Sequence, residues 1–401
     1  LTIVSGTKGG VHNTLVIGGS LSQEDYSIEV AQLLRNAGGA TPNPVQGPIS
    51  LANPDTYWSG PVNYVRTGNS YGDTRGWAIY AFDTLELSPM FELNAGLRYE
   101  NSRAKFRADT VTTPATGAVY TRGADQISDE NLFSYRVGAV FHPVENVSLY
   151  AAYGNSKTPS SATVRLGCGT NCDVAPETGR TYEIGAKAEL MDKKLLLTAA
   201  LFRNERSNYR VPSNDASLPS SLQVLDGKSR VDGFALGLTG AITPNWSIFA
   251  NYTYLDGTVR QSVSDYCLAN PGGGTCTNSA ALPDPQAGDR LIQTPKHSGS
   301  LFTTYTLPFG LQIGYGLTYQ GSFATNQRNM AQRSQYFVDD YLIHRAFVSY
   351  DFGNGLVAQL NVSNLTNADY YTGVRNNVNS TTGIVTGGWT THGEERSAVL
   401  S

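Results

Sequence analysis

The chain has 401 residues, including 42 Gly and 23 Tyr, with a charged fraction of 15% and a formal net charge of −4. No basic run stands out, so the charge pattern gives no reason to expect nucleic acid as a partner. The mean hydropathy is −0.27, and no stretch approaches the roughly 18 apolar residues that a transmembrane helix needs. A transmembrane β-barrel remains compatible with these values, because its strands need an apolar side chain only at every second position.

Alternation of apolar and polar side chains is the recurring pattern, whereas helical periodicity is confined to one possible short helix, Ile28 to Asn36. From Phe91 to Tyr99, for example, Phe, Leu, Ala, Leu and Tyr alternate with Glu, Asn, Gly and Arg. We expect about fourteen antiparallel strands, each close to the ~9–11 residues that cross a bilayer at a tilt. Further alternating segments are Phe133–Phe141, Val147–Tyr153, Tyr182–Leu190, Phe234–Ile242, Trp246–Tyr254, Leu311–Gln320 and Leu356–Val362.

The connections between these segments alternate between short and long. Tight links occur at Ser88-Pro89, His142–Asn146, Met191–Lys194, Thr243–Asn245, Leu307–Gly310 and Gly353–Gly355. Long links cover approximately residues 30–75, 104–131, 155–180, 204–230, 256–296, 321–340 and 367–394. Nothing in the architecture of a soluble β-sandwich places every long loop at one end. A membrane barrel, by contrast, combines tight periplasmic turns with long extracellular loops. The pattern therefore predicts an all-β, antiparallel transmembrane β-barrel.

The barrel hypothesis assigns a direction to each side chain, since a basic residue on the lipid face costs about 2–4 kcal/mol at mid-membrane. We expect Glu92, Arg98, Glu183 and Lys187 to face the lumen. We expect the lipid face to carry Phe91, Leu93, Ile184, Leu311, Ile313 and Leu360. Aromatic residues near strand ends are candidates for the interfacial girdles of a barrel, namely Trp77, Tyr99, Tyr153, Trp246, Tyr254, Phe309, Tyr319 and Phe352.

The four cysteines form two local pairs, Cys168 with Cys172 and Cys267 with Cys276. Neither pair is a Cys-x-x-Cys motif, and no histidine-rich tract accompanies them, so two short-loop disulfides in an oxidising compartment are favoured over a zinc site. The sequence contains no Gly-x-Ser-x-Gly elbow, His-Glu-x-x-His motif or P-loop, and its five histidines are scattered singly. We therefore expect neither an enzyme nor a resident metal centre.

Four segments resemble the barrel of TonB-dependent ferric-siderophore receptors in order and spacing. PETGRTYEIGAKAELMDKKLLLTAALFRNE (Pro176–Glu205) resembles a mid-barrel hairpin of that family, and RVDGFALGLTGAITPNWSIFANYTYLDG (Arg230–Gly257) resembles the next hairpin. TPKHSGSLFTTYTL (Thr294–Leu307) and LNVSNLTNADYY (Leu360–Tyr371) resemble two of its C-terminal landmarks. The general likeness is closest to receptors for catecholate-type siderophores.

The resemblance implies a bacterial outer-membrane protein that binds a ferric siderophore, is surrounded by lipid and is energised by the TonB–ExbB–ExbD complex through a plug domain. Barrels of that family have about 22 strands. We therefore expect residues 1–401 to be a partial barrel, truncated at both ends and without its plug. The iron complex is cargo, so no resident cofactor is implied. A passive porin and a TonB-dependent receptor for haem, cobalamin or a sugar remain the alternatives.

Ferric catecholates are anionic and carry flat aromatic rings, so arginine can pair with them and tyrosine or tryptophan can offer ring faces. In the resembling family, such side chains on the extracellular loops capture the ligand. The candidates in the long links are Tyr57, Trp58, Arg66, Tyr120, Arg122, Arg165, Arg210, Arg328, Arg333 and Trp389.

Overall fold

The computed structural model describes most of the chain. The described residues are 1–7, 9–34, 52, 63–112, 119–160, 165, 172, 175–215, 217, 223–353, 355–379, 382 and 384–401.

The described residues form twenty strands and one short helix. The first strands are β1 Thr2–Gly6, β2 His12–Leu34, β3 Asn63–Ser88, β4 Phe91–Thr112, β5 Val119–Thr121, β6 Gln126–Val144 and β7 Val147–Thr158. They are followed by β8 Glu177–Leu190, β9 Leu195–Pro212, β10 Gln223–Thr243, β11 Trp246–Gln261, α1 Asp265–Ala269, β12 His297–Thr306 and β13 Leu311–Gln320. The last strands are β14 Phe323–Ala324, β15 Phe337–Val338, β16 Tyr341–Gly353, β17 Leu356–Ser363, β18 Tyr371–Val378, β19 Val385–His392 and β20 Ser397–Leu400.

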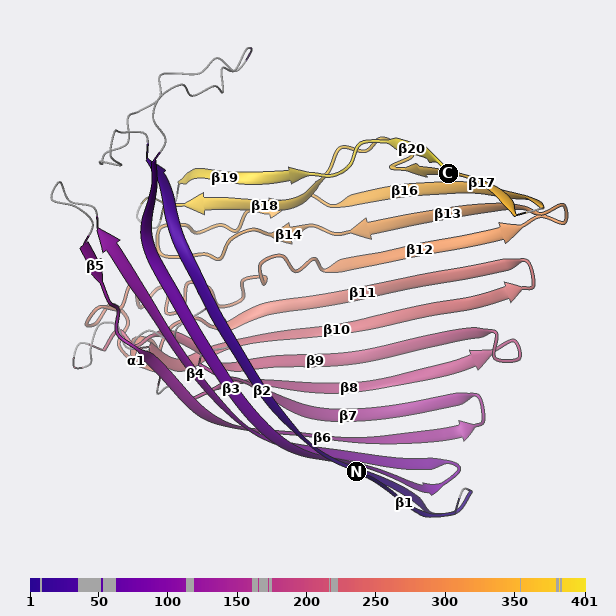
Figure 1. The fold of residues 1–401 in the computed structure, drawn as a ribbon, viewed down its shortest axis with the longest axis horizontal. Helices are drawn as coiled ribbons and strands as arrows, with labels where there is room; N and C mark the ends of the chain where they lie inside the picture. The colour runs from indigo at the N-terminus through magenta and orange to yellow at the C-terminus, as the bar shows by residue number, and fades with distance from the viewer. Residues whose placement is uncertain are drawn as a thin grey trace.

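One curved sheet of 16 strands dominates the fold, and each strand pairs antiparallel with its neighbour along the chain apart from the small inserted strands (Figure 1). Its path runs β1-β2-β3-β4-β6-β7-β8-β9-β10-β11-β12-β13-β16-β17-β20, and β5 pairs with the upper end of β4. The pairs β14–β15 and β18–β19 are separate two-stranded hairpins. The predicted all-β antiparallel architecture is confirmed, with slightly more strands than the alternation suggested.

Every predicted tight link joins two paired strands, and these turns gather at one end of the sheet, opposite the long connections (Figure 1). The strands are longer than predicted at the long-connection end. β2 has 23 residues and β3 has 26, well beyond the ~9–11 needed to cross a bilayer. Polar stretches without apolar alternation remain paired there, since backbone hydrogen bonds do not depend on side-chain chemistry.

The predicted short helix is wrong. Residues Ile28–Leu34 continue β2, with Ile28 opposite Ser70 and Val30 opposite Gly68. The last two residues of the predicted helix, Arg35 and Asn36, lie outside the described residues. β-branched side chains favour strands. Pairing with β3 also gives the backbone N–H and C=O groups of this segment the hydrogen bonds that a helix would otherwise provide. The helix that does form, α1, lies in the β11–β12 connection, where the Ser264 hydroxyl caps it by accepting from the Cys267 amide at 3.2 Å. None of the helical structure in the described ranges is long and apolar enough to span a membrane.

The two faces of the sheet differ in chemistry, as the alternation predicts. Phe91 is 50% exposed and Ile184 is 55% exposed on one face. On the other face the Tyr150 hydroxyl donates to the Glu183 carboxylate at 2.6 Å, and the Lys187 ammonium lies 5.8 Å from the Tyr150 ring centroid. Because exposed apolar side chains of a barrel face lipid, we call the face of Phe91 and Ile184 the outer face and the opposite one the inner face.

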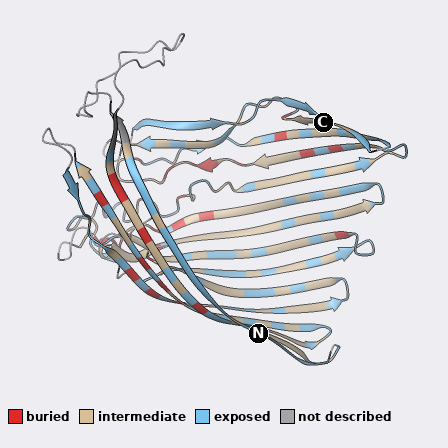
Figure 2. Ribbon diagram, viewed as in Figure 1, coloured by how far each residue is buried: buried red, intermediate tan, exposed pale blue. Residues whose placement is uncertain are grey.

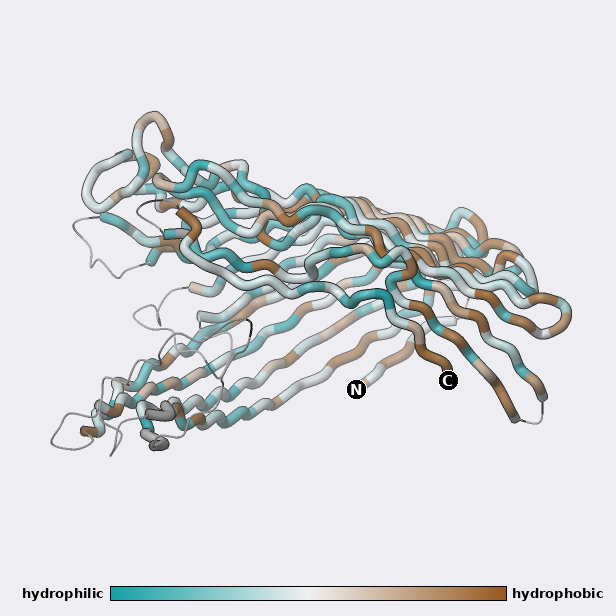
Figure 3. The backbone as a smooth tube through the Cα atoms, turned by 90° about the horizontal axis from the view of Figure 1, so that it is seen from above, coloured by the Kyte–Doolittle hydropathy of each residue, from teal (hydrophilic) through white to brown (hydrophobic). Residues whose placement is uncertain are grey.

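The strand register carries this assignment across the sheet. It places Leu93, Leu311, Ile313 and Leu360 on the outer face and Glu92 and Arg98 on the inner face, as predicted. Figure 3 shows the same alternation of hydropathy along each strand and the bend of the sheet into two walls. An exception is Asp83, which shares the outer face with Leu97 and whose carboxylate accepts a hydrogen bond from Asn13 at 2.8 Å.

Aromatic rings mark two heights on the outer face. Near the long-connection end lies a run that we call the upper girdle. Four pairs of its rings have centroids 4.9–5.9 Å apart, and Tyr99 and Phe133 lie opposite each other in the register. Its members are Trp77, Tyr99, Phe133, Tyr135, Tyr153 and Tyr182. Near the tight turns, Phe91 stacks on Phe141 at 4.8 Å. From Phe91 to Tyr99 is about nine residues, the length of a bilayer-crossing strand segment. Aromatic rings therefore lie at the two heights where the girdles of a barrel are expected.

Candidate functional site

Many buried positions lie toward the long-connection end of the sheet, coloured red in Figure 2, and a group of polar residues is among them. They include Asn69, Asp109, Ser128, Glu130, Ser264 and Asp289. Buried polar groups need hydrogen-bond partners, so their contacts show how the connections are held. These contacts also decide which of the predicted ligand-binding side chains are available to a ligand.

Arg66 belongs to a polar network on the outer face of β2 and β3. Its guanidinium donates to the Asn69 side-chain oxygen at 2.8 Å and lies 3.4 Å from the Glu29 carboxylate. The Asn69 amide in turn donates to the Tyr71 hydroxyl at 2.9 Å. Arg66 is therefore engaged with the barrel wall.

Tyr120 is tied to the same wall through Asp109. The Tyr120 hydroxyl donates a short hydrogen bond to the Asp109 carboxylate, which also accepts from the Gly123 amide at 2.9 Å and the Arg107 guanidinium at 2.9 Å. The Tyr120 hydrogen bond, followed by those from Gly123 and Arg107, holds the pKa of the Asp109 carboxyl below its usual range. The network fastens residues 119–125 beside the upper end of β4, with which β5 pairs.

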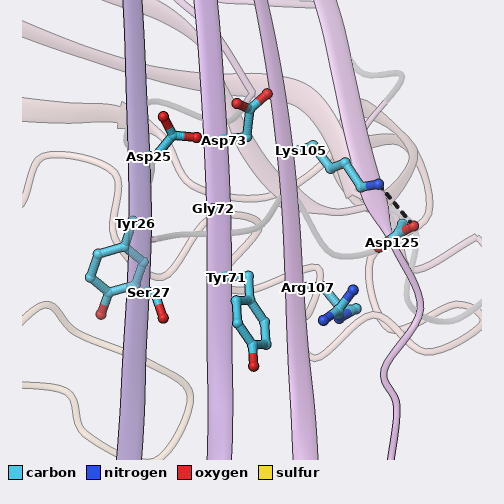
Figure 4. Close-up of a pocket in the computed structure, with 9 residues that line it drawn as sticks. All are labelled: Asp25, Tyr26, Ser27, Tyr71, Gly72, Asp73, Lys105, Arg107 and Asp125. Atoms are coloured by element: carbon cyan, nitrogen blue, oxygen red, sulfur yellow. Dashed lines mark ion pairs between the residues drawn. The ribbon is translucent and has the colours of Figure 1, made fainter.

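A cavity of about 470 Å³ lies beside this network (Figure 4). It is lined by Asp25, Tyr26, Ser27, Tyr71, Gly72, Asp73, Lys105, Arg107 and Asp125. Lys105 pairs with Asp125 at 3.1 Å, and Arg107 lies 4.6 Å from the Tyr71 ring. Tyr71 alternates with Gly72 and shares the parity of Trp77, so its side chain faces outward. With three carboxylates around it, this outward cavity is poorly matched to an anionic siderophore.

Arg328 joins two long connections. Its guanidinium forms an ion pair with the Asp289 carboxylate, and its amide donates to the same carboxylate at 2.7 Å. The neighbouring Arg290 donates to the Ser322 carbonyl at 2.8 Å and lies 5.1 Å from the Phe337 ring. The β13–β16 connection is therefore locked onto the β11–β12 connection, and Arg328 is occupied.

Arg165 and Arg210 both involve the connection between β7 and β8. Arg165 lies in it, with its guanidinium 5.5 Å from the Tyr26 ring on β2. Tyr26 and Gly18 are an even number of residues apart on β2, and Gly18 lies opposite Tyr80 on the inner face. The Tyr26 side chain therefore faces inward, and the β7–β8 connection reaches over the inner face. Arg210 donates to the Ser160 carbonyl at 3.3 Å. Its Nε and Nη2 atoms are buried and have no hydrogen-bond partner among the described residues.

The other predicted ligand-binding residues are scattered. Arg122 has a side chain 63% exposed and lies 3.4 Å from Asp125, Arg333 is exposed, and Trp389 is 54% exposed on the β18–β19 hairpin. Tyr57 and Trp58 lie outside the described residues. The structure thus associates Arg165 and Arg210 with one connection and does not bring the remaining candidates to the same place.

Sequence reasoning missed the acidic anchors Asp109 and Asp289. No local motif signals them, because each acts on residues of another segment, and Asp289 lies 39 positions from Arg328. Among the described residues, no three His, Cys, Asp or Glu side chains gather in a geometry that could hold a metal ion.

The predicted disulfide between Cys267 and Cys276 is confirmed and lies within the β11–β12 connection. Cys172 is also disulfide-bonded. Its predicted partner Cys168 lies outside the described residues.

Comparison with known proteins identifies the family. The family profile described as TonB dependent receptor-like, beta-barrel matches residues 6–365. The catecholate siderophore receptor Fiu of Escherichia coli K12 is 32% identical over 349 residues, which cover 82% of this chain and 42% of Fiu. The probable TonB-dependent siderophore receptor PiuA of Acinetobacter baumannii is 31% identical over 304 residues, 74% of this chain and 37% of PiuA.

Solved structures agree with this result. The closed form of the ferric-catecholate import receptor Fiu from E. coli K12 superposes with a TM-score of 0.76 at 27% identity, over 100% of this chain and 52% of that one. PiuA from A. baumannii gives a TM-score of 0.77 at 26% identity, over 100% of this chain and 54% of that one. The chain spans less than half the length of these curated relatives, 42% and 37%. It belongs to the TonB-dependent receptor family, whose β-barrel it forms in part.

Proposed function

We propose that this barrel acts in the bacterial outer membrane as the wall of a receptor that takes up a ferric siderophore of the catecholate type. The observation that carries the proposal is the 32% identity to a catecholate siderophore receptor over 82% of the chain. The iron complex is the transported cargo, and neither covalent chemistry nor a resident cofactor is needed. A membrane position is supported by the exposed apolar outer face and its two aromatic girdles.

We further propose that uptake is driven by the TonB–ExbB–ExbD complex, acting on a plug domain in a longer receptor of which residues 1–401 are a partial barrel. Family membership and the greater length of the relatives support this view. The inner face is compatible with a domain packed inside. Several of its aromatic rings lie flat across glycines, such as Tyr150 over Gly185 and Phe347 over Gly314, where an added Cβ would meet ring atoms at 2.5 Å and 1.9 Å.

Among the candidates, Arg165 and Arg210 are proposed as the ligand-binding pair. Arg165 reaches the inner face, and Arg210 keeps two buried donors without a hydrogen-bond partner among the described residues. Unpaired guanidinium donors are suited to an anionic oxygen ligand. Arg122, Arg333 and Trp389 are exposed and serve as secondary candidates. Tyr57 and Trp58 stay predictions.

Binding measurements test this assignment. The receptor in detergent should bind a ferric catecholate, and Arg165→Gln with Arg210→Gln should weaken that binding by about tenfold or more, the effect of losing roughly 1.4 kcal/mol. A matched control is Arg75→Gln, an arginine 66% exposed on the outer face of β3 and not a ligand-binding candidate, with an expected change below about twofold. Unchanged binding in the double variant would contradict the assignment. Equal binding of ferric catecholates and ferric hydroxamates would contradict the proposed ligand class.

A further inference from the structure

The outer face of β6 to β9 contains a shallow groove that ends beneath a group of arginines. Two adjoining cavities of about 470 Å³ and 530 Å³ share Tyr182 and Ile184 in their linings. The first extends to Val137 and Ala151, and the second extends to Arg203. Together they form what we call the outer groove, which passes from apolar side chains at mid-sheet to charged ones above the upper girdle.

Small side chains create the depression. Ala139 and Ala151 lie directly opposite each other in the strand register. Taller neighbours flank them, with Val137 49% exposed and Ile184 55% exposed. In a sheet that faces lipid, a furrow with an alanine floor and branched walls offers an acyl chain more contact than a flat surface does.

Charged side chains begin directly above the girdle. Tyr182 is opposite Arg203 in the register, and Arg180 occupies the next outward position on β8. The Asp232 carboxylate lies 2.6 Å from the Arg203 guanidinium and 2.8 Å from that of Arg230, so one carboxylate serves two arginines.

Arg180 increases the positive charge of this group. It is exposed, and no ion pair links it to another side chain in the described ranges, although Glu205 lies opposite it in the register. The next carboxylate on this face, Asp256 opposite Asp232 in the register, is paired with Lys296 at 2.8 Å. Arg180, Arg203 and Arg230 are therefore left with two carboxylates, Asp232 and Glu205. A guanidinium can bind a phosphate through two parallel hydrogen bonds.

The outer face of β2 to β4 at the same height has a different balance of basic and acidic side chains. There Arg75 lies 3.3 Å from Asp73, and Lys105 lies 3.1 Å from Asp125. Arg103 lies opposite Arg75 and forms no ion pair among the described residues, but Asp129 lies opposite it on β6. Asp25 also lines the cavity beside them, so each basic side chain named here has a neighbouring carboxylate and one carboxylate is left over. An excess of positive charge directly above the girdle is thus a property of the β8–β10 wall.

We propose that the outer groove and its arginines hold one lipid with a phosphorylated headgroup, from the leaflet on the long-connection side. The acyl chain lies over Ala139 and Ala151, and the phosphate is bound by Arg180 and Arg203 above Tyr182. The height of the site supports this occupant, because side chains just beyond an aromatic girdle lie among lipid headgroups. The inference rests on the membrane placement within the proposed function, and not on the siderophore.

Native mass spectrometry of the full chain in detergent tests the proposal with two probes, lipid A and its dephosphorylated form. One lipid A should bind per chain. Arg180→Gln with Arg203→Gln should weaken its binding by about tenfold, whereas Arg180→Lys with Arg203→Lys should restore most of it. The dephosphorylated form should bind about as weakly to the parent chain as lipid A binds to the glutamine variant. Ala139→Leu with Ala151→Leu should reduce binding of both forms by occupying the groove.

The matched control is Lys193→Gln, which removes an exposed basic residue at the tight-turn end, where Lys193 pairs with Glu145. It should leave lipid binding unchanged. Heat-modifiable migration in gels reports whether each variant is folded. Equal binding of both lipids, equal effects of Lys193→Gln and the arginine variants, or detergent alone in the groove would overturn the proposal. Because no siderophore is present, failure of the uptake proposal would leave this result interpretable.

Discussion

Arg328 and Asp289 form an ion pair across two connections of the long-connection end, and the Asp289 side chain is only 1% exposed. A buried carboxylate is stable only while its partners remain. This pair therefore holds the β13–β16 connection against the β11–β12 connection, and it removes Arg328 from the set of free ligand-binding cations.

Replacing Arg328 by alanine should release this contact. Asp289 would lose its counter-charge but keep the hydrogen bond from the backbone amide of residue 328. Because the Arg328 side chain is 34% exposed, the cost should be below the roughly 3–5 kcal/mol of a fully buried pair. Hydrogen exchange should accelerate in residues 321–340 and 284–292, while the strands stay protected. The control is Arg333→Ala, an exposed arginine of the same connection, which should leave exchange unchanged. Equal exchange in both variants would show that the pair does not hold the connections.

Gly314→Ala should destabilise the inner wall. Its new methyl carbon would lie 1.9 Å from the Phe347 ring, and such overpacking typically costs about 1–3 kcal/mol. The thermal unfolding midpoint in detergent should fall, and the additional change Phe347→Leu should recover part of the loss. Gly387→Ala is the control, since an added methyl there meets nothing within 4 Å. A midpoint for Gly314→Ala no lower than that of the control would contradict the close contact.

Ile184→Lys should lower the stability of the barrel in lipid by about 2–4 kcal/mol, because it puts a charge on the outer face near mid-membrane. Lys187→Gln changes the same strand three positions away, on the inner face, and should have little effect. Denaturant-induced unfolding in lipid vesicles compares the two variants. A smaller effect at Ile184 than at Lys187 would reverse the assignment of the faces.

Attachment of residues 119–125 should depend on pH. The pKa of Asp109 is lowered in the folded state, so its contribution is present above the unfolded value of about 3.9 and is lost as pH falls through the lower folded value. A spin label at Val119 should become mobile on acidification below about pH 4. Asp109→Asn should remove that transition. A transition of unchanged size in this variant would assign it to another group.

Alternation alone predicted the sheet, its tight turns and the orientation of side chains such as Glu183 and Ile184. Successive side chains of a strand point to opposite faces, so apolar residues at every second position identify the face that contacts lipid. Alternation underestimated the length of β2 and β3, which continue to pair through their backbones beyond the alternating segments. The upper half of β3 carries mostly polar side chains. The sequence pattern misassigned Ile28–Leu34 because a short apolar run has the same appearance in a helix and in a strand.

The long-connection end was less predictable. Residue type identifies Arg66, Tyr120 and Arg328 as good ligand-binding side chains. Their acidic partners, however, come from other segments, namely Glu29, Asp109 and Asp289. Which of these groups is occupied depends on tertiary contacts that no local spacing encodes. By contrast, the pair Cys267–Cys276 closes within one connection and was predictable for that reason.

Growth of an iron-starved strain that lacks its own siderophore receptors tests the central claim most directly. The longer gene that carries this barrel should restore growth on a ferric catecholate, and only while TonB is present. Residues 1–401 expressed alone should not restore it, because energy from TonB would have no plug domain to act on. Growth supported by residues 1–401 alone, or by the longer gene without TonB, would contradict gated uptake and favour a passive channel.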